Sequence, residues 1–412
     1  MKMRNTRSRT ALGAGLSLAI LLAACAGTDG TDGAAPDEPA ATGTEEPDTE
    51  EPNTEEPATD EPATEEPDAG ESGAWDADAP PEWEEILAAA AEEGEVVVAG
   101  PAFLDDAMTT AFEADTGLTL SYLGGNTREL NSRLDQEAQA GNVTIDVSMG
   151  GGTQLNTLLP EGLLEPIRPQ LILPSATNND NWKPGDQKYL DNDDQYMLQT
   201  TEWIHGWVAV NPDSLGDITV TTWDDLLQPE LVGRIAAYDP RTGGQGQSAA
   251  AYLAEVKGMD YIVELFDGQE VTYTQDGGQL MEWIARGTYD VALGGIAPDV
   301  ERYRTEGLPI EVRHMEDGPG ALTGGFSVLK QPVGAPHPNA AQVFLNWWAS
   351  GRGLDVYAEV LMEPSLRVDS EAEVPEYVTP QEGVDYIDQY TEDWYTTVRP
   401  QVTEELAEAL GR

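Results

Sequence analysis

The sequence is poor in the residues that build disulfides, metal clusters and common catalytic sites. It has one cysteine and three histidines among 412 residues, so neither an intramolecular disulfide nor a cysteine-clustered zinc or iron–sulfur site can form. The histidines lack metal-ligand spacing, and the chain has no Gly-x-Ser-x-Gly nucleophile motif and no P-loop with its lysine. Pairs of carboxylates are uninformative in a chain with 76 acidic residues. The sequence therefore predicts no enzyme activity, no cofactor and no metal site.

Basic residues are also scarce, with 21 Lys and Arg against 76 Asp and Glu, which gives a formal net charge of -55. Nucleic acid, itself a polyanion, would be repelled and is excluded as a natural partner. Residues 1–25 hold four bases and no acid, whereas residues 26–80 hold 19 acids and no base. The remaining chain still has a net charge of -40. We interpret this charge as a solvated exterior kept soluble by self-repulsion; a cationic partner is the alternative.

Residues 1–25 have the pattern of an export signal. After the basic start, residues 11–24 form an uncharged run of 14 residues, too short to span about 30 Å of hydrocarbon but suited to a signal-peptide core. Residues 22–25 (Leu-Ala-Ala-Cys) resemble a bacterial lipobox, in which the cysteine receives the lipid. We expect lipidation of Cys25 and anchoring in a membrane; an ordinary signal peptide with a coincidental cysteine is the alternative.

Residues 26–80 repeat a short acidic phrase. Glu-Glu-Pro, once replaced by Asp-Glu-Pro, recurs five times between residues 45 and 67. This composition cannot bury apolar surface, and like charges with proline keep a chain extended. We therefore expect a disordered acidic linker with a reach of about 150 Å, long enough to hold a domain away from a membrane.

Residues 81–412 show apolar periodicities that alternate between helix and strand. Helices are predicted at 84–93, 105–116, 128–140, 222–227, 248–256, 277–286 and 339–350, and strands at 95–99, 118–123, 144–148, 234–238, 271–274, 290–293 and 310–314. Such alternation is typical of an α/β fold with mostly parallel sheets. The pattern predicts two α/β bodies joined by extended segments.

Glycine-containing loops follow several of the predicted strands. In open α/β sheets, ligands bind beyond the carboxyl ends of the strands, where helix N-termini also point. Glycine allows close approach of backbone N–H groups, and a helix N-terminus favours an anion. The alternative is that the glycines only allow tight turns between strand and helix and bind no ligand. The ligand-binding candidates are Gly125, Asn126, Thr127, Gly151, Gly152, Thr153, Trp203, Tyr238, Arg241, Gly244, Gln245, Gly246, Gln247, Ser248 and Gly295.

Aromatic residues give a second clue. Trp203, His205 and Trp207 alternate in residues 201–210, which we predict to be one strand with all three rings on one face. Large rings on one face commonly belong to a core. A segment that joins two lobes instead lies at the bottom of their cleft, which would place these rings near a ligand.

An ordered set of phrases from about Trp83 to Asp369 is similar to a known family. The phrases are Ala-Glu-Glu-Gly-Glu-Val-Val-Val at 91–98, Asp146 before Gly150–Gly152, Leu-Glu-Pro at 164–166, Ala-Val-Asn at 209–211, Thr-Trp-Asp-Asp-Leu-Leu at 222–227, Gly-Arg-Ile at 233–235, Trp-Ile-Ala-Arg-Gly at 283–287, Ala-Pro-His-Pro-Asn-Ala-Ala at 335–341 and Pro-Ser-Leu-Arg-Val-Asp at 364–369. Together they resemble the bacterial extracellular solute-binding proteins of ABC importers, in the ferric-iron-transport-like branch.

The resemblance implies a two-lobed, type II periplasmic-binding-protein-like fold whose hinged cleft closes on a small-molecule ligand. It assigns residues 94–201 and 313–355 to lobe I, and 202–312 and 356–412 to lobe II. The bound protein would then dock on the transmembrane permease subunits of the importer; delivery to a sensor is the alternative. We expect a monomer, lipid-anchored on the extracellular face of the cytoplasmic membrane, in the cell envelope or periplasm.

The resemblance also bears on the ligand. Iron-binding relatives hold the metal with two neighbouring tyrosines, and the matching stretch here is Gly-Gly-Ile-Ala at 294–297. The loop 241–248 matches the place where relatives bind phosphate or carbonate, and it keeps the glycines and a hydroxyl. We therefore expect a small organic or phosphorylated anion or an iron chelate. The alternatives are ferric ion held by other oxygen ligands, or a surface-anchored hydrolase.

Overall fold

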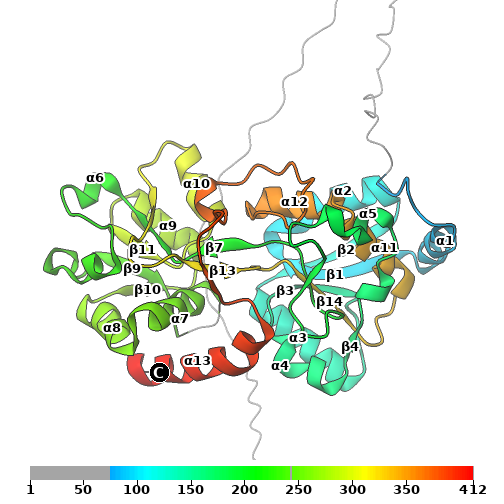
Figure 1. Ribbon diagram of the computed structural model, residues 1–412, viewed down its shortest axis with the longest axis horizontal. Coiled ribbons are helices and arrows are strands. Elements are labelled where there is room, and N and C mark those ends of the chain that lie inside the picture. The colour runs from blue at the N-terminus through cyan, green and yellow to red at the C-terminus, as the bar shows by residue number, and fades with distance from the viewer. Residues whose placement is uncertain (1–74, 242–243, 412) are drawn as a thin grey trace, which may run out of the picture. The chain divides into compact units, whose positions relative to one another are not determined.

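The structure is a computed structural model that describes residues 75–241 and 244–411. The predicted signal peptide, Cys25 and nearly all of the acidic linker fall on residues 1–74 and lie outside the described residues. Within the described ranges, no helix is long and apolar enough to cross a membrane. Two sheets surrounded by helices form the body of the protein (Figure 1).

The first lobe is built on a seven-stranded mixed sheet in the order β2-β1-β3-β14-β6-β5, with β4 paired to β14. Strand β1 runs parallel to β2 and β3, whereas β14 runs antiparallel to β3. The strand order reverses between β1 and β3, and because β1, β2 and β3 are parallel, the loops that follow them open at one edge of the sheet. The strands are β1 Glu95–Pro101, β2 Thr119–Gly125, β3 Val147–Gly150, β4 Leu164–Glu165, β5 Lys188–Tyr189, β6 Leu198–Gln199 and β14 Val328–Pro332.

Helices bury an aromatic-rich core against this sheet. The ring centres of Phe112 and Trp347 lie 5.2 Å apart in an edge-to-face arrangement, and both side chains are fully buried. The helices are α1 Trp83–Glu93, α2 Asp105–Thr116, α3 Thr127–Ala140, α4 Gln154–Thr157, α5 Pro174–Thr177, α11 Pro338–Ala349 and α12 Arg352–Leu361. The predicted strand at 144–148 begins later, at Val147, because the buried carboxylate of Asp146 accepts a hydrogen bond from Val97 N (2.8 Å).

The second lobe is built on a five-stranded sheet in the order β10-β9-β11-β8-β12. Strand β9 runs parallel to β10 and β11, and β8 runs antiparallel to β11 and β12. The strands are β8 Trp207–Val210, β9 Ile235–Tyr238, β10 Thr272–Thr274, β11 Val291–Leu293 and β12 Glu311–His314. The helices are α6 Pro212–Leu215, α7 Gln245–Lys257, α8 Met259–Val263, α9 Gly277–Ala285 and α10 Ala297–Thr305. All six predicted strands and helices from 234 to 314 are present within a few residues.

Single helical turns connect many of these elements. The 3-10 turns are η1 Ala102–Leu104, η2 Leu159–Glu161, η3 Arg168–Gln170, η4 Asn179–Asn181, η5 Trp223–Leu227, η6 Pro229–Leu231 and η8 Glu376–Val378, and the π-helical turns are η7 Glu264–Gly268 and η9 Trp394–Val398. The helix predicted at 222–227 is η5, which Thr222 and Asp225 cap reciprocally.

A three-stranded sheet, β15-β13-β7, joins the two lobes. Its strands are β7 Trp203–His205, β13 Ala321–Thr323 and β15 Ile387–Asp388. The prediction of one strand over 201–210 is wrong, because Gly206 breaks it with a positive φ of 90° and β8 continues into the second sheet. Glycine is required there, since a Cβ would lie 2.7 Å from the ring of Tyr252.

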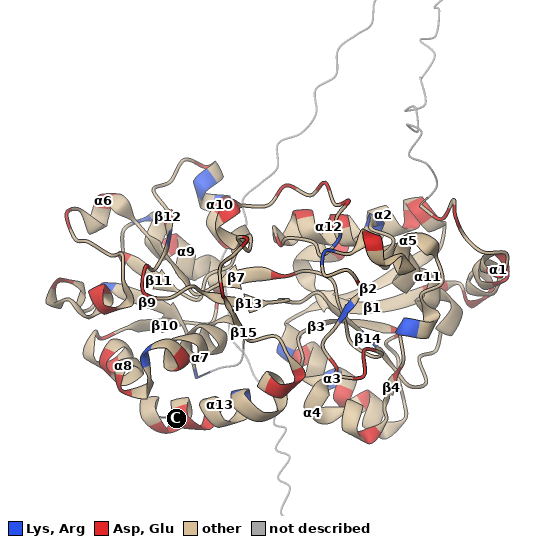
Figure 2. Cartoon of the chain, in the orientation of Figure 1, with Lys and Arg blue, Asp and Glu red and all other residues tan. Residues whose placement is uncertain are grey.

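The chain after residue 355 does not stay in the second lobe as predicted. Tyr357, Leu361 and Leu366 are buried in the core of the first lobe, because α12 packs against α2 and α11. The last helix, α13 Arg399–Leu410, packs against α7 and α8 of the second lobe. Acidic residues are spread over both lobes (Figure 2), and in the sequence they greatly outnumber basic ones.

Candidate functional site

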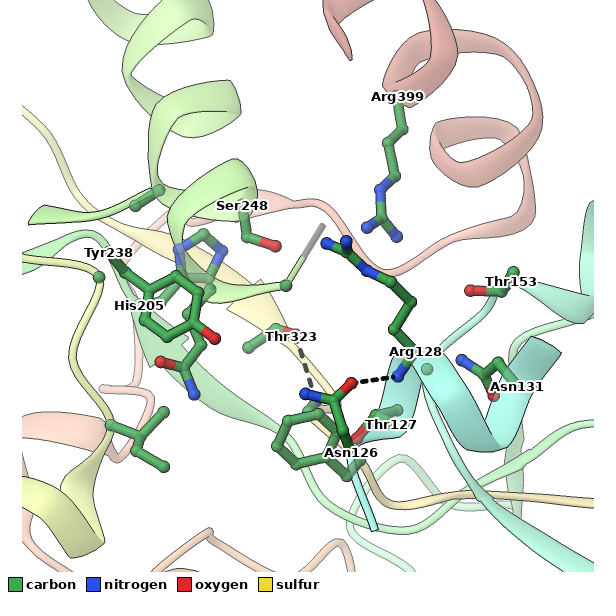
Figure 3. Close-up of a pocket in the computed structure, with 18 of the residues that line it drawn as sticks. Asn126, Thr127, Arg128, Asn131, Thr153, His205, Tyr238, Ser248, Thr323 and Arg399 are labelled. Carbon is green, nitrogen blue, oxygen red and sulfur yellow. Dashed lines mark hydrogen bonds between the residues drawn. The ribbon is translucent and has the colours of Figure 1, made fainter. Parts of the chain in front are cut away.

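One pocket with a volume of about 750 Å³ is lined by residues of both lobes and of the connecting sheet (Figure 3). The first lobe contributes one face of α3 and the loop after β3. The second lobe contributes the loops after β9 and β11 and the start of α7. The predicted candidates that line it are Asn126, Thr127, Gly151, Thr153, Trp203, Tyr238, Gly244, Gln245, Ser248 and Gly295; the candidates that do not are Gly125, Gly152, Arg241, Gly246 and Gln247.

The N-terminus of α3 faces the pocket from the first lobe. Asn126 caps the helix, and its Oδ1 accepts a hydrogen bond from Arg128 N (2.9 Å). The cap places Thr127 and the guanidinium of Arg128 at the pocket (Figure 3). The helix dipole and a full positive charge therefore act on the same space, which favours an anion.

One turn further along α3, Asn131 also lines the pocket. Its side chain is only 8% exposed, and its Oδ1 is buried with no hydrogen-bond partner among the described residues. A buried acceptor without a partner costs free energy. This wall therefore offers an acceptor to a hydroxyl or N–H group of a solute, beside the positive charge of Arg128.

The N-terminus of α7 faces the pocket from the second lobe. Gly244 is its N-cap, and Gln245 and Ser248 of the first turn line the pocket. Gly246 has a different use, because a Cβ there would lie 2.4 Å from the carbonyl oxygen of Tyr238. This glycine allows α7 to begin directly against the end of β9 and does not itself reach the pocket.

Arg241 lies outside the pocket and is held by neighbours. Its Nε and Nη2 donate to the two carboxylate oxygens of Asp239, at 2.8 and 3.0 Å, and its guanidinium lies 4.7 Å from the ring centre of Tyr273. Desolvation would raise the pKa of Asp239, but the hydrogen bonds and charge of Arg241 lower it. The predicted anion contact of Arg241 is therefore replaced by an internal ion pair.

The loop after β3 is supported from behind by a buried lysine. Lys330 is fully buried and donates a hydrogen bond from Nζ to the carbonyl oxygen of Gly151 (2.8 Å). Burial lowers its pKa to about 7, although the charge of Asp135 opposes this shift. Lys330 does not line the pocket, so it positions the backbone of the loop.

The connecting sheet forms the base of the pocket. Trp203, His205 and Trp207 line it, although they belong to two strands in different sheets. Burial lowers the pKa of His205 to about 4, so the imidazole is neutral at neutral pH. The rings supply an apolar surface with few polar atoms, as is usual at the base of a solute pocket.

Sequence reasoning missed the residues that carry positive charge into the pocket. Arg128 and Arg399 both line it, and Figure 3 shows both guanidinium groups directed toward the same part of it. Arg128 directly follows the predicted loop 124–127, so its position could have been foreseen. Tyr390, Tyr395 and Arg399 come from the far end of the described chain, where no local pattern pointed to a ligand.

Among residues 75–241 and 244–411, no group of three or more His, Cys, Asp or Glu side chains could hold a metal ion. Three tyrosines, Tyr238, Tyr390 and Tyr395, supply phenolic oxygens at the pocket. Burial raises the pKa of Tyr390 well above 10, which opposes loss of its proton.

Known structures share this fold. The periplasmic binding protein AfuA of Actinobacillus pleuropneumoniae, with fructose-6-phosphate bound, is 21% identical over 77% of this chain and 98% of its own, with a TM-score of 0.62. Iron-bound HitA of Pseudomonas aeruginosa is 17% identical over 76% and 99%, with a TM-score of 0.58. Apo ferric ion-binding protein A of Pasteurella haemolytica is 16% identical over 77% and 98%, with a TM-score of 0.57.

The structural similarity establishes the two-lobed fold. At these sequence identities it does not establish which solute is bound. No curated protein matches the sequence. The sequence model described as bacterial extracellular solute-binding protein matches residues 107–375, which contain both sheets except β1. This match rests on the sequence and is therefore independent of the fold similarity, and the pocket between the two lobes agrees with it. The protein belongs to the bacterial extracellular solute-binding protein family.

Proposed function

We propose that this protein captures a small organic anion, with a phosphorylated compound as the first candidate, and delivers it to the permease of an ABC importer. The observation that carries the proposal is that Arg128 and the N-termini of α3 and α7 meet at one pocket from opposite lobes. Arg128 and both helix N-termini favour negative charge, so an anion that contacts all of them would stabilise the closed arrangement of the lobes.

Asn131 narrows the class of solute. Its buried Oδ1 has no partner among the described residues and would accept a hydrogen bond from a solute. The hydroxyl groups of a hydroxylated organic body would provide such donors beside the anionic group. The volume of about 750 Å³ also leaves space beyond an anionic group. The phosphorylated sugar named for AfuA is an example of this chemistry.

The proposal includes where the protein works. We infer that residues 1–25 direct export, that Cys25 is lipidated, and that the acidic linker holds the binding body away from the outer face of the cytoplasmic membrane. The body would act as a monomer. Cys25→Ser is expected to move the protein from the membrane fraction to the soluble fraction, and retention in the membrane would contradict the lipid anchor.

A thermal-shift screen tests the solute class. The panel contains hexose phosphates, inorganic phosphate, di- and tricarboxylates, polyamines and ferric citrate. A solute at 100 times its Kd stabilises the folded state by about 2.7 kcal/mol, a readily measured shift in Tm. Stabilisation by anions supports the proposal. Stabilisation by polyamines alone, or hydrolysis of an ester or glycoside without any stabilisation, would contradict it.

Isothermal titration then tests the anion contact. Arg128→Gln is expected to weaken binding of the anion found in the screen about tenfold or more, because a charge-assisted hydrogen bond is lost. Arg133→Gln is the matched control, since Arg133 lies on the same helix, outside the pocket, and pairs with Glu137. Equal loss in both variants would show a general charge effect and no specific contact.

A second candidate, ferric ion, rests on the three tyrosines of the pocket. Tyr390 and Tyr395 lie close together, with ring centres 5.5 Å apart, and phenolate oxygens suit a hard cation. Titration with ferric ion should then produce a phenolate-to-iron absorption band that is lost in Tyr395→Phe. A colourless titration would exclude this candidate.

A further inference from the structure

A segment near the C-terminus connects both lobes and lines the pocket. We call residues 389–410 the C-terminal strap; it begins after β15 and contains η9 and α13. Figure 1 shows it running beneath the molecule from the region of α3 and α4 to that of α7 and α8. The family match ends at residue 375, so the whole strap lies beyond it.

The strap is fixed to the first lobe at its beginning. Asn156 Nδ2 donates a hydrogen bond to the carbonyl oxygen of Tyr395 (3.1 Å), and Asn192 N donates to the carboxylate of Glu392 (2.6 Å). The ring of Tyr395 also occupies the space above Gly152, where a Cβ would lie 2.9 Å from it. Helix α4 and the loop after β3 thus form a seat for this part of the strap.

The strap is fixed to the second lobe by its last helix. The side chain of Gln247, on α7, donates to Thr403 Oγ1 (2.9 Å) and accepts from Arg399 Nη2 (2.9 Å). Leu406 is 1% exposed and belongs to the core of the second lobe. The π-helical turn η9 lies between the two points of attachment, and such turns are frequent at functional sites.

Arg399 stands at the junction, and its neighbours position it without neutralising it. Its guanidinium lies 4.9 Å from the ring centre of Tyr395 and 5.7 Å from that of Trp394. Its Nε and Nη2 both donate to one amide oxygen of Gln247. Over the described part of the chain, Arg399 forms no ion pair with a carboxylate, although acidic residues outnumber basic ones by 76 to 21.

We infer that the C-terminal strap is a third wall of the binding site and that Arg399 contacts the anionic group of the solute, opposite Arg128. The inference rests on the proposed function, because it assumes an anionic solute. It adds that recognition depends on a segment that connects the two lobes. Since the strap is attached to both lobes, the position of Arg399 depends on the spacing between them.

The test compares substitutions of equal charge change in the full mature chain. Binding of a hexose phosphate and of inorganic phosphate is measured by isothermal titration for the wild type, Arg399→Gln and Arg286→Gln. Arg286 is the control because its side chain is 72% exposed and lies outside the pocket. Arg399→Gln is expected to weaken binding about tenfold and to reduce its salt dependence, whereas Arg286→Gln stays within about twofold.

A second variant distinguishes loss of the contact between Arg399 and the solute from general destabilisation of the protein. Arg399→Lys keeps the charge and the long stem but cannot offer paired N–H donors, so it should bind several-fold more weakly than the wild type with an unchanged Tm. Wild-type affinity in both Arg399→Gln and Arg399→Lys would overturn the inference.

The failure of the inference and the failure of the proposed function give different results. If Arg128→Gln weakens binding while Arg399→Gln matches Arg286→Gln, the strap is only structural and the anion site survives. If the wild type binds no anion of the panel, both proposals are overturned.

Discussion

Two loops that look alike in the sequence are used differently by the two lobes. Each is rich in glycine, follows a strand and leads into a helix: residues 150–153 after β3 and residues 239–248 after β9. At Gly152 a Cβ would lie 2.7 Å from Leu190 and 2.9 Å from Tyr395, whereas at Gly244 nothing lies within 4 Å. Glycine in the first loop therefore admits the ring of Tyr395, whereas in the second loop Gly244 faces open space and Gly246 admits the backbone at the end of β9.

The largest expected effect comes from filling the first loop. Gly152→Ala should lower the free energy of unfolding by about 3 kcal/mol, because overpacking forces the ring of Tyr395 and the side chain of Leu190 to move. Gly244→Ala is the matched substitution and should cost only about 1 kcal/mol, since its positive φ of 104° is strained but its space is open. Urea unfolding measures both.

The same two variants should also differ in solute binding. Gly152→Ala displaces Tyr395 and should weaken phosphate or hexose phosphate binding as well as stability. If Gly152→Ala and Gly244→Ala cost the same, the two loops are equivalent and the comparison fails.

The next effect concerns the buried lysine behind the first loop. Burial lowers the pKa of Lys330 from 10.5 to about 7, so between these pH values the folded state binds fewer protons than the unfolded state. Stability contributed through Lys330 therefore rises with pH across this window and is unchanged below it. From pH 7 to pH 9 the wild type should gain on the order of 2 kcal/mol relative to Lys330→Met.

Lys257 provides the control for this measurement in the second lobe. It pairs with Asp224 and Asp317, and its pKa is raised chiefly by its hydrogen bond to Asp224. Lys257→Met should therefore leave the pH dependence between 7 and 9 unchanged. Parallel pH curves for the wild type and Lys330→Met would mean that Lys330 keeps its proton on folding.

The smallest effect is expected at the second loop. Arg241→Ala should change the Kd for an anion by less than about twofold, because Arg241 is paired with Asp239 outside the pocket. Titration calorimetry beside Arg128→Gln checks this. A tenfold loss in Arg241→Ala would show that the loop rearranges on binding and brings Arg241 to the solute.

The sequence predicted most of the regular structure because local signals were strong. Helix α2 has the predicted bounds 105–116, and Gly117 ends it with a φ of 70°. The break at Gly206 was missed because alternation of Trp203, His205 and Trp207 continues across it. The positive φ of Gly206 and the ring of Tyr252, from a distant helix, make glycine necessary there.

Part of the candidate site was predicted from the sequence. Separation along the chain explains which pocket residues were found and which were missed. Loops at strand ends were found because topology places them at one edge of a sheet. The strap was not found, since its contacts join residues such as Asn156 and Tyr395 that are 239 positions apart. Lys330 was missed because nothing in an apolar strand pattern shows that a charged residue will be enclosed.

The same long separation sets the order in which the protein can assemble. The core of the second lobe forms largely from neighbouring segments. The core of the first lobe and the seat of Tyr395 on α4 instead require closure of loops of 232 and 239 residues, as the contacts of Asp115 with Trp347 and of Asn156 with Tyr395 show. Such closure is slow and comes after local structure. We therefore expect a refolding intermediate in which the core of the second lobe is formed while Tyr395 is still exposed to solvent. Competence to bind the solute would then be the last property that a newly exported molecule acquires.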